Sequence, residues 1–314
     1  MFAKKMKNES GFTLIEMLLA MSLGIVVMGV AIFTYNKQST VLRIGNQETQ
    51  TRGMARLAMD ALVKNIQAAG SGMPPGDSKI NNGANPPVYT PRNAQGISKA
   101  SSVAMTLLAN TDNINTFIIF DPNPVAFPTI TTFQVPPASA NTGDPATTFA
   151  ADDQVVIFDV SSPATTVRRV VQSVSSPTAN FDAMVITAAV NSAIITPVRN
   201  SVPFMISKYH EITITFDSVA ETITLVDDMG TDDGGGDDTT TIIANNVTNL
   251  TFTYFDSFDT MVDVSTPLDW ANTADQAELG SIRGVAIDIT VRDQNETAVT
   301  TTLTSGVTLR NMGI

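Results

Sequence analysis

The sequence predicts an α+β protein: one long N-terminal α-helix, membrane-spanning in its first half, packed on a mostly antiparallel β-sheet head. Three observations predict this. An apolar run follows a basic N-terminus, a helical pattern without proline continues to residue 69, and strand-like runs fill most of the remainder. The chain also holds 41 threonines among 314 residues. Because β-branched side chains suit a pleated, half-buried surface, most of the chain beyond the helix should be sheet.

The first half of the helix is expected over residues 12–34, an apolar run of 23 residues that carries one charge, Glu16. At about 1.5 Å per residue, a helix of this length spans roughly 34 Å, which is enough to cross a hydrocarbon core of about 30 Å. Lys4, Lys5 and Lys7 precede the run. The positive-inside rule therefore places the N-terminus in the cytoplasm and the rest of the chain across the membrane.

The second half of the helix is expected to be amphipathic and to occupy residues 35–70. One helical face is marked by small and apolar residues at steps of three or four: Ala55, Met59, Leu62, Ile66 and Ala69. The sequence GSGMPPG follows at residues 70–76, and glycine and proline end helices. A helix from Phe12 to Ala69 would be about 87 Å long.

Residues 71–100 are rich in proline, glycine and asparagine and are expected to form a loop that leads into a β-rich head at 101–314. Within the head, residues 209–226 alternate around a short turn and predict a hairpin. Further strand-like runs lie at 102–108, 115–120, 154–160, 166–174, 182–190, 245–256, 282–294 and 297–313.

Composition excludes several classes of function. The formal charge of −12 and a pI near 4.4 argue against a nucleic-acid partner, because binding phosphates needs clustered lysine and arginine. The absence of cysteine excludes disulfides, thiolate nucleophiles and cysteine-based zinc sites. The single histidine, His210, excludes an HExxH motif and is expected to be a surface residue of a strand. No catalytic or cofactor-binding residue is predicted, and the chain is not expected to be an enzyme.

The N-terminal segment is open to three interpretations. A secretory signal has an apolar region of about 7–15 residues before a small-residue cleavage site, whereas this run is longer and lacks such a site. A plain anchor leaves Glu16 unexplained, since a carboxylate inside the membrane costs about 2.5–3.5 kcal/mol on insertion scales. The third interpretation uses the sequence GFTLIEML at residues 11–18. It resembles the cleavage motif of type IV prepilins and pseudopilins.

This resemblance implies processing followed by assembly. Prepilin peptidase would cut between Gly11 and Phe12, remove the leader of residues 1–11, and N-methylate Phe12. Glu16 would then pair with the cationic N-terminus of a neighbouring subunit, which offsets the burial cost of both charges and sets the packing register. The long helix would be the spine of a pilin, with residues 12–34 in the membrane or the filament core.

Three C-terminal runs resemble PilW-type minor pilins, which are relatives of the J-type minor pseudopilin of type II secretion: NNVTNLTFTYFD (245–256), VAIDITVR (285–292) and TSGVTLRN (304–311). The resemblance implies other minor and major pilins and an inner-membrane assembly platform as partners. It also implies a tip complex that primes pilus assembly and can carry an adhesin. The protein would cross the inner membrane once, with a periplasmic head, before it reaches the pilus and the cell surface.

Two alternatives stay open at this stage. A minor pseudopilin of a type II secretion system would share the same motif and differ in its neighbouring genes. A membrane-anchored periplasmic binding protein or hydrolase would keep an uncut N-terminus and would show a cleft with convergent polar groups. Two carboxylates suffice for a glycosidase, so composition leaves this second alternative open.

The acidic tract DDMGTDDGGGDD at residues 227–238 is expected to be the solvated tip of a hairpin. Carboxylates next to flexible glycines are also suitable ligands for Ca²⁺. A weak calcium site is therefore a secondary prediction for the six aspartates of the tract: Asp227, Asp228, Asp232, Asp233, Asp237 and Asp238. No other cofactor is expected.

Overall fold

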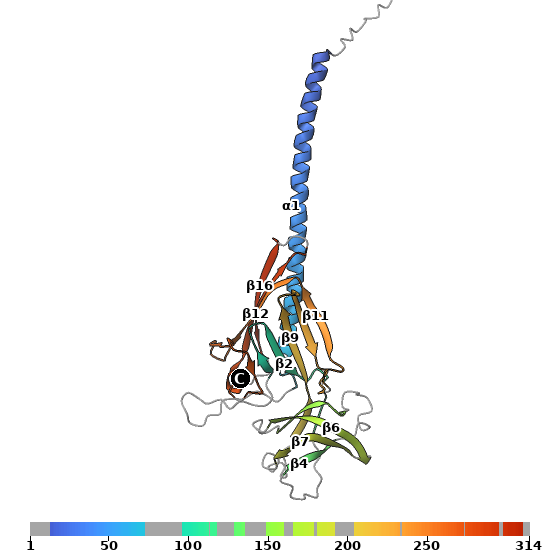
Figure 1. Ribbon diagram of the computed structural model, residues 1–314, viewed down its shortest axis with the longest axis vertical. Coiled ribbons are helices and arrows are strands. Elements are labelled where there is room, and N and C mark those ends of the chain that lie inside the picture. Colours follow the sequence, from blue (N-terminus) through green and yellow to red (C-terminus); the bar gives the residue numbers. More distant parts are fainter. Residues whose placement is uncertain are drawn as a thin grey trace, which may run out of the picture. The chain divides into compact units, whose positions relative to one another are not determined.

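The structure is a computed structural model that describes residues 13–72, 96–112, 114–117, 129–135, 149–159, 166–178, 181–191, 204–232, 234–272, 274–294 and 298–309. Two compact units divide at Gln50 and Thr51. The predicted α+β class is confirmed, since one long helix precedes a set of antiparallel sheets (Figure 1). The predicted cleavage residues Gly11 and Phe12 and residues 73–95 of the predicted loop lie outside the described residues.

The long helix α1 runs over Leu14–Ala68. It begins two residues after the predicted start and ends one residue before the predicted end. In the first unit its apolar side chains are exposed, from Leu14 to Ile44. Among the described residues, α1 is the one helix that is long and apolar enough to cross a membrane.

The part of α1 in the second unit has the predicted apolar face. Ala55, Met59, Leu62, Ile66 and Ala69 are all buried. They belong to a core built with apolar residues of two sheets. Because side chains four residues apart lie on one side of a helix, this spacing places the whole face against the sheets.

The end of α1 is fastened to the end of a strand. Gly70 and Gly72 have φ angles of 75° and 68°, a conformation that glycine adopts at low cost. The N–H of Gly70 donates to the carbonyl of Leu108 at 2.7 Å, and the N–H of Asn110 donates to the carbonyl of Ser71 at 2.7 Å. The chain therefore leaves the helix next to strand β2.

The strands that the structure describes form three sheets, and their registered pairs are antiparallel (Figure 1). The first has the order β11-β10-β9-β2-β1-β14, the second β13-β12-β15-β16, and the third β3-β8-β5-β6-β7-β4. The bounds are β1 Ile97–Ala100, β2 Ala104–Ala109, β3 Asn115–Phe117, β4 Thr129–Val135, β5 Gln154–Asp159, β6 Thr166–Thr178, β7 Phe181–Asn191, β8 Phe204–Lys208, β9 His210–Asp217, β10 Thr222–Asp227, β11 Thr239–Asn245, β12 Val247–Phe255, β13 Met261–Val262, β14 Leu268–Asp269, β15 Gly284–Arg292 and β16 Thr300–Thr308. A short helix, α3, spans Gln276–Ser281.

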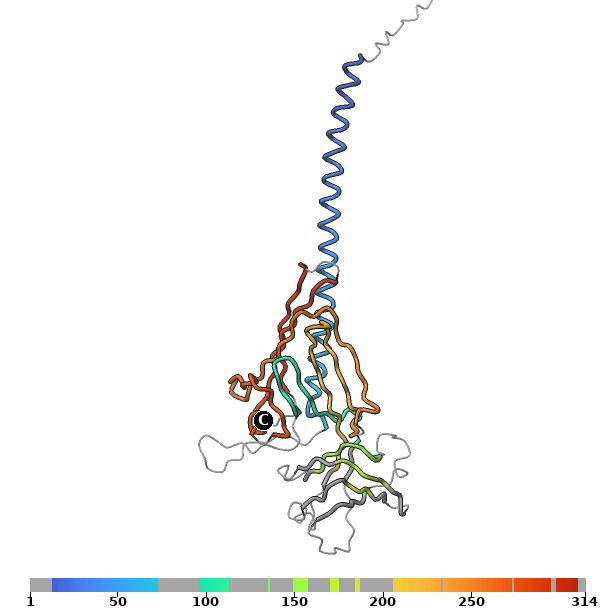
Figure 2. The backbone as a smooth tube through the Cα atoms, viewed as in Figure 1, coloured from blue at the N-terminus to red at the C-terminus, as the bar shows by residue number. Residues whose placement is uncertain are grey.

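The described residues of the head form two hydrophobic cores. The first is shared by α1 and the first two sheets, and it contains Phe252, Tyr254 and Trp270. The second lies in the third sheet and the segments that lead into it, with Val155, Ile157 and Ile206 as members. In Figure 2, strands β2 and β9 lie side by side although about a hundred residues separate them, as their registered pairing requires.

The chain returns from the third sheet to the first through a single residue, Tyr209, which separates β8 from β9. Hydrogen bonds of Asn110 and Ser207 stabilise this crossing. The amide Nδ2 of Asn110 donates to Ser207 Oγ at 2.8 Å, and Ser207 Oγ donates to the carbonyl of Gly72 at 3.1 Å. The crossing is therefore held by buried polar contacts as well as by the chain itself.

Most predicted strands are present, and the hairpin expected at 209–226 is the pair β9–β10. The expected loop at 71–100 ends earlier than predicted, because β1 begins at Ile97 and pairs with β2. The sequence patterns also missed β4, β8, β11, β13, β14 and α3. Several of these elements are short or lie beside proline-rich and acidic turns, where alternation is weak.

Candidate functional site

The carboxylate of Glu16 lies in the first turn of α1, where it caps the helix. Thr13 donates from its backbone N–H and from its hydroxyl to Oε2 of Glu16, both at 2.9 Å. In return, the N–H of Glu16 donates to Thr13 Oγ1 at 3.4 Å. This reciprocal pattern is a capping box, which satisfies amide groups that have no partner within the helix.

The capping box was readable in the sequence and was missed. Threonine followed three residues later by glutamate marks a helix start, and Thr13 and Glu16 stand in that relation. The sequence motif predicts pairing of Glu16 with a neighbouring subunit, which stays a prediction. In the single chain, the carboxylate of Glu16 accepts hydrogen bonds from Thr13 at the start of its own helix.

A second candidate site is a cluster of charged side chains where the first and third sheets meet. Its centre is His210, the first residue of β9, whose exposed fraction is 1%. The expectation that His210 is a surface residue is therefore wrong. Alternation within the run made its face uncertain, and the neighbouring hairpin end covers the ring.

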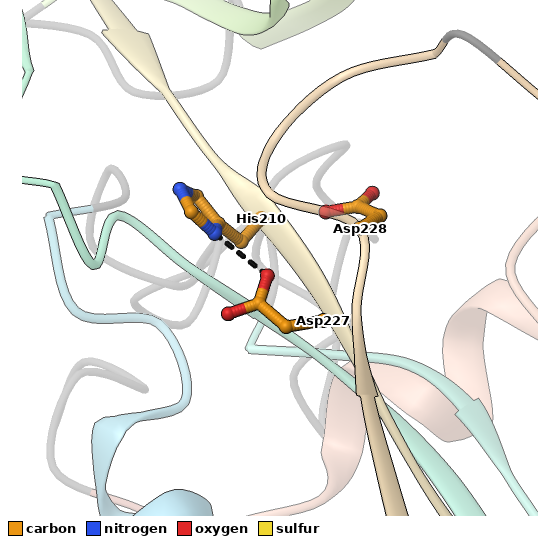
Figure 3. A group of neighbouring side chains, drawn as sticks. All are labelled: His210, Asp227 and Asp228. Atoms are coloured by element: carbon orange, nitrogen blue, oxygen red, sulfur yellow. Dashed lines mark hydrogen bonds and ion pairs between the residues drawn. The ribbon is translucent and has the colours of Figure 1, made fainter. Parts of the chain in front are cut away.

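The imidazole of His210 lies between two carboxylates. Its Nδ1 donates to Asp227 Oδ1 at 2.7 Å (Figure 3). Its Nε2 lies 3.0 Å from Asp112 Oδ2, an ion-pair distance, although Nε2 has no hydrogen bond of good geometry among the described residues. Beside it, Lys208 Nζ lies 2.9 Å from Asp153 Oδ1 and 3.8 Å from Asp112 Oδ2.

Asp228 lies in the loop after β10, and its ligand atom lies within 4.8 Å of those of His210 and Asp227 (Figure 3). Its Oδ1 accepts the backbone N–H groups of Glu211 at 2.7 Å and Gly230 at 2.9 Å. Its Oδ2 accepts a hydrogen bond from Gln154 Nε2 at 2.6 Å. Three donors therefore fix the carboxylate in one orientation.

Gly230 allows the loop to approach this closely. Its φ is 72°, and a Cβ there would lie 2.5 Å from Cε of Lys208 and 2.9 Å from Cδ2 of His210. Both the backbone conformation and the space require glycine. The loop after β10 therefore packs directly on the two basic residues of the cluster.

The cluster shifts the pKa values of its members. Burial would lower the pKa of His210, but the hydrogen bond to Asp227 and the charges of Asp227 and Asp112 outweigh burial and raise it. Burial would raise the pKa of Asp227, but the hydrogen bond to His210 and the charge of His210 outweigh burial and lower that pKa. Burial raises the pKa of Asp228 to about 6, despite the hydrogen bonds from Gly230 and Glu211.

The acidic tract forms the connection between β10 and β11, as the prediction of a hairpin tip required. The tract is not solvated throughout, since Asp227 and Asp228 are half-buried. His210, Asp227 and Asp228 present ligand atoms within 4.8 Å of one another. Further along the tract, Asp237 accepts a hydrogen bond from Thr231 Oγ1 at 2.7 Å. Asp233 lies outside the described residues, and calcium binding by the whole tract stays a prediction.

Comparison with known proteins bears on the N-terminal site. The family model described as the prokaryotic N-terminal methylation motif matches residues 6–32. The match supports a protein that resembles type IV pilins and pseudopilins in its N-terminal segment. It includes Gly11, Phe12 and Glu16, and it indicates a substrate of prepilin peptidase. It also favours a structural protein over an enzyme.

The match covers less than a tenth of the chain. No curated protein and no solved structure matches the sequence. The head, including the charged cluster around His210, is therefore interpreted from its own geometry.

Proposed function

We propose that the protein is a minor type IV pilin of the PilW type. In this proposal it is cleaved between Gly11 and Phe12, N-methylated on Phe12, and incorporated into a pilus or its tip complex, where it primes assembly. The observation that carries the proposal is the division of α1. From Thr51 onward one face of the helix packs into the head, whereas the apolar residues before Ile44 are exposed.

The exposed apolar part of α1 needs an apolar environment other than the head. Bare apolar surface of this extent is unfavourable in water. The membrane covers it before assembly, and neighbouring helices cover it in a filament core. The methylation motif at residues 6–32 is the observation that favours a filament over a permanent anchor.

Glu16 supports the proposal through exchange of partners. In the single chain its carboxylate accepts hydrogen bonds from Thr13. After cleavage, a cationic N-terminus of a neighbouring subunit offers a stronger, charge-assisted donor. Since an unpaired charge in an apolar core is costly, only the packing register that pairs the two groups is favourable.

The proposed location and partners follow from these parts. The protein crosses the inner membrane once, with its N-terminus in the cytoplasm and its head in the periplasm. Prepilin peptidase processes it, and an inner-membrane assembly platform builds it into a filament with other minor and major pilins. An adhesin at the tip is a further partner of such a complex.

Mass spectrometry of the N-terminus tests the proposal. The protein is extracted from membranes of cells with and without prepilin peptidase. The expected mature chain begins at N-methylated Phe12, and it is absent without the peptidase. Gly11→Val should block cleavage, because a branched side chain obstructs the approach of the peptidase to the backbone. A chain that keeps Met1 in the presence of the peptidase would overturn the filament proposal.

Assembly distinguishes the pilin from the pseudopilin. If the protein is a minor pilin, deletion of its gene should reduce surface pili and leave protein secretion intact. The opposite result, loss of type II secretion with normal piliation, would assign it as a minor pseudopilin. The neighbouring genes provide an independent test. Genes for pilus minor subunits would support the pilin, and genes of a secretion system would support the pseudopilin.

A further inference from the structure

We propose that His210, Asp227 and Asp228 bind one divalent transition-metal ion of the zinc class. The three side chains come from the start of β9 and the end of β10, and their ligand atoms lie within 4.8 Å of one another (Figure 3). One imidazole nitrogen and two carboxylate oxygens form a ligand set that zinc accepts in proteins. This site lies in the head and is independent of the N-terminal motif.

The imidazole is oriented as a metal ligand would be. Its Nδ1 faces Asp227 Oδ1 at 2.7 Å, which is the side where the ion would lie. Its other nitrogen, Nε2, is buried, has no well-formed hydrogen bond among the described residues, and lies 3.0 Å from Asp112 Oδ2. A metal on Nδ1 fixes the proton on Nε2, and a carboxylate commonly accepts that proton at metal-bound histidines. Asp112 is placed for this role.

The carboxylate ligands are held in place by donors behind them. Asp228 accepts hydrogen bonds from two backbone N–H groups and from Gln154. An ionised carboxylate has about four lone-pair sites, so the three donors leave one for an ion. Asp227 accepts the N–H of Met229 at 2.9 Å on the oxygen that also faces His210. Orientation of this kind lowers the cost of assembling a metal site.

The charges of the cluster also favour a cation. Asp112, Asp153, Asp227 and Asp228 contribute four carboxylates, and Lys208 and His210 contribute two bases. Even with the imidazole protonated, the negative charges exceed the positive ones by two. Asp112 is exposed, but Asp153 is buried and Asp227 and Asp228 are half-buried, so their unbalanced negative charge is unfavourable. A divalent ion at Nδ1 replaces one proton and reduces this excess.

The donor set selects the class of metal. Calcium and magnesium prefer oxygen ligands alone, whereas imidazole favours zinc and its neighbours in the first transition series. The inferred site therefore differs from the calcium site that the acidic tract predicts. It includes a histidine from β9, and it needs only the first two aspartates of the tract.

The ion would fasten the end of the β9–β10 hairpin, next to the crossing between the third and first sheets. His210 follows Tyr209, where the chain leaves the third sheet, and the loop after β10 packs over it through Gly230. Ligands from both segments would then share one ion. Binding to the folded state alone raises stability with ligand concentration, so the thermal midpoint of the head is a direct readout.

The test uses the full chain in detergent after removal of metals with EDTA. Titration with zinc chloride should show one ion per chain by calorimetry and a rise in the thermal midpoint. His210→Gln keeps a donor toward Asp112 but removes the Nδ1 ligand, and Asp228→Asn keeps an oxygen acceptor for the backbone donors. Each should weaken zinc binding at least about tenfold. Asp237→Asn is the matched control in the same tract and should bind zinc as the parent chain does.

Three outcomes would overturn the inference: no stoichiometric zinc binding by the parent chain, binding unchanged in both ligand variants, or equal loss in Asp237→Asn. Cobalt substitution provides a readout that does not depend on the folding of variants. Cobalt(II) bound through an imidazole and two carboxylates should give intense ligand-field absorption in the parent chain. A spectrum identical to that of the hydrated ion would also overturn the inference. Failure of the N-terminal processing test leaves this result unaffected.

Discussion

The carboxylate of Glu16 has two roles, one in its own helix and one in the proposed filament. In the single chain Glu16 accepts hydrogen bonds from the start of α1. In the proposed filament the same group pairs with the N-terminus of another subunit. The two roles are separable because Thr13 contributes to the first alone.

Substitution at these two residues should distinguish helix capping from subunit pairing. Glu16→Gln removes the charge and should lower assembly into filaments by at least about tenfold, since breaking a buried ion pair costs several kcal/mol. Thr13→Val removes the hydroxyl donor and leaves the carboxylate, so assembly should stay near the parent level. Quantification of sheared filaments measures both, with mass spectrometry to verify that cleavage is unchanged. Equal loss in the two variants would assign Glu16 to capping.

Gly230 and Gly234 offer a matched pair for testing the packing of the loop on the cluster. Both have positive φ, 72° and 82°, but a Cβ at Gly230 meets Lys208 and His210, whereas one at Gly234 meets nothing within 4 Å. Alanine at either residue is strained by about 1 kcal/mol or more. Gly230→Ala should cost clearly more, as measured by denaturant unfolding. Equal costs would show that the loop yields without disturbing the cluster.

At the scale of elements, α1 is one helix in two environments. Leu62 is fully buried against the sheets, and Leu57, five residues earlier, is 72% exposed. Both residues belong to α1 and lie in the second unit of the chain. Because both leucines lie in the same helix and differ in burial, a difference in stability between their alanine variants measures the packing of Leu62.

Leu62→Ala should destabilise the head by about 2–5 kcal/mol, the range for a large-to-small change in a packed core. Leu57→Ala should change stability by less than about 0.5 kcal/mol, as surface substitutions do. Denaturant unfolding of the full chain in detergent, followed by circular dichroism, measures both. Similar midpoints for the two variants would mean that α1 is not part of the cooperative core.

The elements differ in how well the sequence predicted them. The buried face of α1 was predicted at all five residues, because a helical period with no interrupting proline is a strong signal. The hairpin β9–β10 was also predicted, from clear alternation. Strand β11 was missed, since it lacks a buried face and follows a glycine-rich acidic turn.

The meeting of His210 with Asp227 could have been found from the hairpin. The observed register pairs Ile212 with Asp227, which places residue 210 beside the first residues of the acidic tract. The contacts of Asp112 and Asp153 with this cluster could not have been found in the same way, because they depend on how the third sheet joins the first. Contacts set by sheet-to-sheet arrangement have no signature in a single sequence.

For the whole molecule, the cluster predicts an unusual dependence of stability on pH in metal-free buffer. Asp228 has a pKa raised from 3.8 to about 6, so folding favours its protonated form, and stability should fall as pH rises from about 4 to 6. His210 has a raised pKa, so its stabilising contribution is present below about 6.5 and is lost as pH rises through the folded value. Asp227, whose pKa is lowered, contributes above 3.8 and loses its contribution in more acidic solution.

Thermal midpoints measured in EDTA from pH 4 to pH 8 should therefore decline across this range. Asp228→Asn should flatten the part between pH 4 and 6 and leave the part above 6.5, since only the first depends on its carboxyl. A midpoint that rises steadily from pH 4 to pH 7 would contradict the assignment of these groups.

The fastening of α1 to β2 has a mechanical consequence. In the proposed filament, tension would load each subunit along α1. The paired backbone bonds from Gly70 to Leu108 and from Asn110 to Ser71 pass that load directly to β2. Strand β2 lies inside the first sheet, with β9 on one side and β1 on the other. Pulling therefore strains two ladders in shear at once, and the head can bear force through its middle instead of unravelling from an edge.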